Sequence, residues 1–177
     1  MALAPAIKWQ TRLQLDDGED FAGLADEDWL VLTALRVDID GVDYEIEAGL
    51  VTDGGSIPTA AQAVVGERWS RPVRKPFVWH DGGYKRKLLR ITPGELEAKP
   101  FAYTQKWLDD TLFRLIEHGQ NEAMRLWNDG KGPTRWQRFG AWLRRHRIWV
   151  ALRALGWIAW NQDGRRTNKT TTKGPAA

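Results

Sequence analysis

The chain of 177 residues contains no cysteine, so disulfides and thiolate zinc sites are excluded. This composition suits a protein made in a reducing cytoplasm. The sequence also lacks any run of about 18 apolar residues, so no segment is predicted to span a membrane. Residues 1–8 do not combine a basic start with an apolar core, and no signal peptide is expected. No glycine-rich phosphate loop and no serine nucleophile elbow occur either.

The alternation of apolar residues predicts an α+β fold in one domain over residues 1–160. Leu35, Val37 and Ile39 alternate before the turn signal Asp40-Gly41, and an alternating stretch over residues 42–46 follows, so a β-hairpin is expected. Residues 29–32 are interpreted as an extension of the first strand, and the residues before them as an arm or edge strand. Residues 50–52 resemble a strand end. A helix near residue 80 and a long central helix are expected to follow.

The positive charge is concentrated at the C-terminal end of the chain. Residues 131–177 hold eleven lysines and arginines against a single acid, Asp163, whereas the preceding residues are net acidic. Five tryptophans lie among these basic residues, which suits a lipid interface, nucleic acid or a protein partner. The alternative is one or two ordinary amphipathic helices from about residue 131, packed through Trp149, Leu152, Leu155 and Ala159. Residues 161–177 are expected to form a flexible basic tail.

A histidine followed by an aspartate is the clearest candidate for chemistry, since only three histidines are present. Neighbouring side chains on a helix point about 100° apart, so His80 and Asp81 are not expected to share one partner. In one interpretation, Asp81 binds a hard cation, which prefers oxygen ligands, and His80 acts as a general base on water. Tyr84, four residues after His80, is then placed to donate a hydrogen bond in the site. The alternative is a buried structural histidine beside a turn aspartate.

A second candidate segment is the glycine-containing loop that begins at Asp53. Gly54 and Gly55, like the later pair Gly82-Gly83, predict a tight backbone turn. Without Cβ atoms, such a loop exposes backbone groups to a ligand, and together with Asp53 it suits a cation. The alternative is a strand-to-helix turn in which Asp53 or a nearby serine caps the next helix.

The long central helix is predicted over roughly residues 101–127. Asp109 projects about 20° from Ile116 and faces the apolar side, whereas Asp110 lies nearly opposite Leu112. The apolar residues at helical spacing, which mark the expected buried face, are Leu108, Leu112, Leu115, Ile116, Ala123 and Leu126.

A carboxylate on the buried face needs a partner, and His80 is the candidate. A carboxylate bound to the far ring nitrogen would set the tautomer that a general base requires. The alternative leaves Asp109 or Asp110 as an exposed helix charge that pairs with Lys106 or Arg114.

In chain order, these segments resemble the phage and prophage family catalogued as domain of unknown function 1353. The pattern expected of that family reads TD-x-x-SIP, then HD-x-x-Y, then D-x-x-F. The matching residues here are GLVTDGGSIP at 49–58, His80-Asp81 with Tyr84, Asp110 to Phe113, and a later Gly156 before a tryptophan. The resemblance spans roughly residues 44–160. It implies a phage origin, in the host cytoplasm or the phage particle, without an assigned activity.

The same segments are also similar to the bacterial and fungal secreted phospholipases A2. That resemblance implies a calcium loop at Asp53 with the Gly54-Gly55 backbone, and a calcium carboxylate at Asp81. It implies that His80 is the water-activating base and that Asp110, rather than Asp109, orients it. Those enzymes carry disulfides, including a cysteine in the calcium loop where this chain has Gly55. Because of the intact spacing to Phe113, the motif favours Asp110 over the choice made from the helix face.

The sequence is therefore compatible with three functions. The first is a phage-encoded, calcium-assisted ester hydrolase, with phospholipid as the substrate class. The second is a non-enzymatic virion or assembly component whose Trp/Arg-rich C-terminus binds other phage proteins. The third is nucleic-acid binding through the same basic end.

Overall fold

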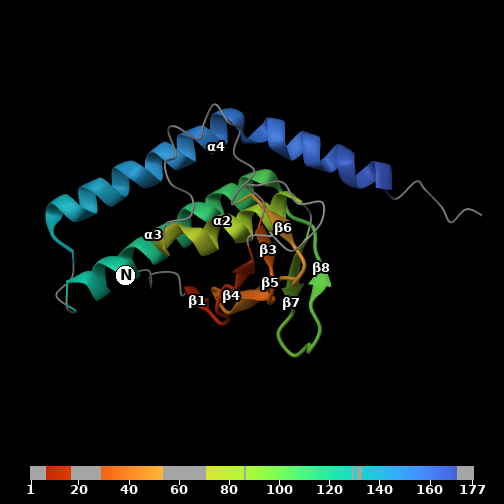
Figure 1. Cartoon of the computed structure of the whole chain (residues 1–177), viewed down its shortest axis with the longest axis horizontal. Helices are drawn as coiled ribbons and strands as arrows, with labels where there is room; N and C mark the ends of the chain where they lie inside the picture. The colour runs from red at the N-terminus through yellow and green to blue at the C-terminus, as the bar shows by residue number, and fades with distance from the viewer. Residues whose placement is uncertain are drawn as a thin grey trace, which may run out of the picture.

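The computed structural model describes residues 7–16, 29–53, 71–85, 87–128, 130 and 133–170, with the backbone alone at 71, 155–159 and 162–170. Within these residues the protein has the predicted α+β architecture, with two antiparallel sheets on one side of three helices (Figure 1). Helices α2 and α3 pack against each other and lie between the strands and helix α4. The glycine loop at 54 and 55 lies outside the described residues.

The larger sheet is built around the predicted hairpin. Its strand order is β1 (Ile7–Trp9), β4 (Leu35–Ile39), β5 (Val42–Ile46), β7 (Leu88–Ile91) and β8 (Lys99–Pro100). The turn between β4 and β5 has positive φ at Asp40 (58°) and Gly41 (82°), as a two-residue hairpin turn of type I′ requires. The hairpin is confirmed, and the N-terminal strand β1 is the edge strand beside β4.

The smaller sheet contains β2 (Leu15–Asp16), β3 (Trp29–Val31) and β6 (Val51–Thr52). Strand β3 pairs with β6 through Trp29 and Leu30, so it does not extend the first hairpin strand as expected. Because the chain bends between Val31 and Leu35, β3 and β4 enter different sheets. Strand β6 ends just before Asp53, as predicted.

Three helices follow the strands: α2 (Arg71–Tyr84), α3 (Gln105–Trp127) and α4 (Arg135–Thr170). Thr104 caps α3 by accepting a hydrogen bond from the Trp107 N–H. Helix α4 is a single helix that continues through residue 170, whereas a flexible basic tail was expected from residue 161. No proline interrupts residues 135–170, and isolated glycines are tolerated within a helix.

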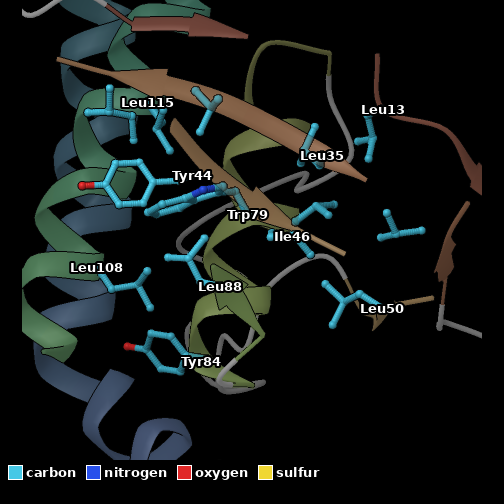
Figure 2. Packing of buried hydrophobic residues seen from close by; sticks show 14 residues of the cluster. Leu13, Leu35, Tyr44, Ile46, Leu50, Trp79, Tyr84, Leu88, Leu108 and Leu115 are labelled. Carbon is cyan, nitrogen blue, oxygen red and sulfur yellow. The ribbon is translucent and has the colours of Figure 1, made fainter. Parts of the chain in front are cut away.

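The core lies between the larger sheet and helices α2 and α3. Figure 2 shows Trp79 of α2 between Tyr44 of the sheet and Leu88, with Leu108 of α3 nearby. A second apolar cluster joins α2 and α3 to α4 through Phe77, Leu112, Ile116, Ile148 and Leu152, among others. The predicted buried face of α3 is confirmed over its first half. Leu126 instead lies exposed, since the end of α3 runs beyond the core.

Candidate functional site

Helix α2 brings the histidine-aspartate pair into the protein interior. His80 and Asp81 are both fully buried. Gly82 and Gly83 continue the helix and form no turn, which corrects the expectation for this glycine pair. A Cβ at Gly82 would lie 2.7 Å from an Ile46 side-chain atom, and one at Gly83 would lie 2.4 Å from Leu108. The two glycines therefore let the sheet and α3 approach α2 closely on both sides.

His80 meets the carboxylate of Asp109, which α3 contributes. The His80 Nε2 atom lies 2.9 Å from Asp109 Oδ1, and neither side chain is exposed. If Asp109 accepts this hydrogen bond from a neutral imidazole, the His80 proton is on Nε2. The lone pair of the imidazole is then on Nδ1. Within the described part of the chain, this buried Nδ1 atom has no hydrogen-bond partner.

Tyr84 and Gln105 complete the hydrogen bonds around Asp109. The Tyr84 hydroxyl donates to Asp109 Oδ1 over 3.0 Å, and Gln105 Nε2 lies 3.4 Å from Oδ2 and 3.3 Å from the Tyr84 hydroxyl. Burial, followed by the negative charge of Asp109, raises the pKa of Tyr84 far above its ordinary value. Tyr84 therefore remains a protonated donor, and its placement four residues after His80 is as predicted.

Asp110 does not take part in this network. It forms an ion pair with Lys106 one turn earlier on α3, and its side chain is 41% exposed. The carboxylate that contacts His80 is thus Asp109, chosen from the helix face, and not Asp110, which the phospholipase motif favoured. The physical reason is that adjacent helix positions differ by about 100°, so Asp109 and Asp110 cannot both face α2.

Asp81 faces a different partner from His80, as the helix geometry predicted. Its Oδ2 atom lies 2.8 Å from Lys85 Nζ, one turn later on α2. Lys85 Nζ also donates to the backbone carbonyl of Val51 over 2.8 Å. The ammonium thus joins the buried carboxylate to strand β6, two residues before Asp53.

This arrangement bears on the expected calcium site. Calcium binds several oxygen ligands, which the expectation drew from Asp81, Asp53, Gly54 and Gly55. Gly54 and Gly55 lie outside the described residues, and no group of three or more potential metal-ligating side chains occurs among the residues that are described. A lysine ammonium already neutralises Asp81. Among the described residues, the ion pair with Lys85 therefore occupies Asp81, and calcium binding there stays a prediction.

The His80 network is covered by helix α4. The Trp160 ring lies edge-on to Tyr84, with centroids 5.4 Å apart, and also contacts Tyr103. A cleft of about 680 Å³ lies elsewhere, and the residues that line it include Arg12, Trp29 and Arg74 but not His80. His80 itself is fully buried, so access to it requires the packing around it to open.

Sequence reasoning missed three residues of this network: Lys85, Gln105 and Trp160. The first two could have been predicted from the sequence. Lys85 stands four residues after Asp81, and Gln105 stands four residues before Asp109, a spacing that places side chains on one helix face. No sequence signal marks Trp160, because its contact with Tyr84 depends on how α4 crosses α2.

Comparison of the chain with family models, curated proteins and solved structures found no match in any of the three. Over the described residues, no helix is both long and apolar enough to cross a membrane.

Proposed function

We propose that this protein is a phage-encoded hydrolase in which His80 activates water for attack on an ester. The observation that supports this most directly is the state of the imidazole. Its Nε2 atom faces Asp109 and its Nδ1 atom has no partner among the described residues, so in the tautomer protonated at Nε2 the Nδ1 lone pair can accept a proton. A general base needs this tautomer, held in this way.

The reaction follows from these side chains alone. Nδ1 of His80 accepts a proton from water as the water oxygen attacks the ester carbonyl carbon. Asp109 stabilises the imidazolium that forms, and the Tyr84 hydroxyl keeps the carboxylate in place. The acyl C–O bond then breaks, and the imidazolium returns its proton to the leaving alkoxide. The substrate class, a phospholipid ester, is the one implied by the resemblance to secreted phospholipases.

Calcium is not assigned a step in this reaction, because Lys85 holds Asp81. Complete burial of His80 means that catalysis requires local opening, and Trp160 is one of the groups that must move. General-base catalysis of this kind contributes about 10² to 10⁴ in rate.

The test is turnover of a soluble chromogenic ester and of phosphatidylcholine vesicles. The variants are His80→Ala and His80→Asn, with Asp110→Asn as the matched control, since Asp110 lies outside the network. Removal of His80 should reduce turnover about a hundredfold or more, and Asp110→Asn should leave it unchanged. His80→Asn replaces the imidazole by a polar amide that is not a base, so a folded but inactive His80→Asn protein separates loss of the base from loss of the fold. Absence of turnover by the wild type on both substrates would contradict the proposed hydrolase function.

A second candidate function is a non-enzymatic virion or assembly component. The observation that favours it is the combination of a fully buried His80–Asp109 pair with exposed aromatic residues on α4. In that case a phage carrying His80→Asn should give normal particle yield, whereas replacing the exposed Trp136, Phe139 and Trp142 of α4 together by serine should prevent assembly. Low yield from His80→Asn, with the folded protein present at its normal level, would contradict it.

A further inference from the structure

Helix α4 exposes a row of aromatic rings near its N-terminal end. Trp136, Phe139 and Trp142 are 83%, 54% and 46% exposed. The rings lie against one another along the helix: Phe139 is stacked on Trp142, and Trp136 meets Phe139 edge-on. Large exposed apolar side chains that gather in this way mark an interaction surface.

Among the described residues, the two buried apolar clusters do not include this row. Helix α4 packs on α2 and α3 through the buried residues Ile148, Ala151 and Leu152. The row precedes these residues on the helix and remains exposed. Helix α3 ends and α4 begins at the same end of the molecule (Figure 1). Trp127, the last residue of α3, is 83% exposed. Hydrogen bonds between Asn128 and Gln137 join the two helices there.

The charged residues of α4 near the row have one sign. Residues 131–162 contain no aspartate or glutamate, and the exposed side chains of Arg135, Arg138 and Arg147 lie on the same helix as the row. Arg145, by contrast, pairs with Glu117 of α3. The exposed face of α4 is therefore both aromatic and cationic, and it is complementary to an apolar surface that carries negative charge.

We propose that this face of α4 binds an anionic lipid surface, with the helix lying in the plane of the interface. Tryptophan and phenylalanine rings bury their apolar bodies at the boundary between headgroups and acyl chains, and arginines pair with lipid phosphates. The helix lies on the bilayer without crossing it, in keeping with the absence of a spanning helix in the described chain.

Two other binding partners for this face of α4 fit the same observations less well. Single-stranded nucleic acid stacks its bases on open ring faces, whereas here Phe139 and Trp142 stack on each other and Trp142 lies 4.1 Å from the His146 ring, centroid to centroid. A second copy of the chain would bring two arginine-rich faces together, and like charges oppose that contact.

The test is cosedimentation of the whole chain with vesicles, either of phosphatidylcholine alone or of an equimolar mixture of phosphatidylcholine and phosphatidylglycerol. We expect binding to the mixed vesicles that weakens with added salt. Replacing Trp136, Phe139 and Trp142 together by serine should reduce affinity by about tenfold per ring. Arg135→Gln and Arg138→Gln should each reduce it about fivefold. Leu96→Ser is the matched control, because Leu96 is 98% exposed but lies outside α4.

Binding is measured without turnover, so the proposal stands independently of the hydrolase. The variant His80→Asn should bind mixed vesicles like the wild type even if it is inactive. The lipid proposal is overturned by equal affinity for both vesicle types, by undiminished binding of the folded triple-serine variant, or by equal loss with Leu96→Ser. Retention of an oligodeoxythymidine strand that depends on the row, without vesicle binding, would assign the face to nucleic acid. Dimers that the triple-serine variant loses, again without vesicle binding, would assign it to a second copy.

Discussion

The His80 imidazole and the Asp109 carboxylate meet inside the protein, with Nε2 2.9 Å from Oδ1 and neither side chain exposed. The two residues come from different helices, so this contact fixes the distance and rotation of α2 relative to α3. It also sets the tautomer of His80, on which the proposed chemistry depends. The same contact therefore contributes to the stability of the protein and to the activity proposed for it.

The first prediction compares Asp109→Asn with its neighbour Asp110→Asn. Asp109 accepts hydrogen bonds from His80 and Tyr84 in the interior, so Asp109→Asn should lower the free energy of unfolding by about 1.5–3 kcal/mol. Asp110 forms an exposed ion pair, and its substitution should change stability by less than about 0.5 kcal/mol. Urea unfolding of both variants makes the comparison. Equal effects would contradict the assignment of Asp109.

The second prediction concerns Gly119, where α3 passes close to α2. Pro76 has no N–H group, so the carbonyl of Pro72 lacks its usual partner within the helix. A Cβ at Gly119 would lie 2.2 Å from that carbonyl oxygen. Because backbone cannot move aside as a side chain can, Gly119→Ala should destabilise the protein by about 1–3 kcal/mol.

Gly140→Ala is the matched control, because a Cβ there meets nothing within 4 Å on the exposed side of α4. Alanine is the better helix former, so this change should stabilise the protein by up to about 1 kcal/mol. Thermal unfolding distinguishes the two, and a tolerated Gly119→Ala would show that α2 and α3 are further apart than described.

The third prediction uses the raised pKa of Tyr84. Burial and the charge of Asp109 keep its proton on the folded protein above pH 10.0, the ordinary tyrosine value, whereas the unfolded chain releases it. This contribution to stability is complete below pH 10.0 and is lost as the pH rises above it, by about 1.4 kcal/mol per pH unit for one proton. Urea unfolding on both sides of that pH should show a steeper loss for the wild type than for Tyr84→Phe. Parallel slopes would mean that Tyr84 is not buried against Asp109.

The fourth prediction addresses calcium. Lys85 competes with any cation for Asp81, so calcium should raise the melting temperature of Lys85→Gln by more than that of the wild type. A ligand specific for the folded state stabilises it by about 2.7 kcal/mol at a hundredfold excess over its dissociation constant. Asp81→Asn should remove the response in either background. No difference among the four proteins would show that Asp81 is not a calcium ligand.

Much of the fold could be predicted from local sequence patterns. The alternation around Asp40-Gly41 predicted the β4–β5 hairpin, and the helical spacing of apolar residues predicted most of α3 and the burial of Asp109. These predictions succeed because strand and helix periods depend on the residues within each element. Strands β7 and β8 were missed. They are four and two residues long, too short to carry a clear periodic signal.

The sequence by itself determined which residues could face inward, including His80 and Asp109, because helix geometry places them regardless of the neighbouring elements. Only the tertiary structure decided that these two meet, that Lys85 reaches both Asp81 and strand β6, and that Trp160 covers Tyr84. It also decided that Trp136 and Trp142 stay exposed although Leu152 of the same helix is buried. The physical reason is that such contacts depend on where two elements cross, and packing of the whole core sets that position.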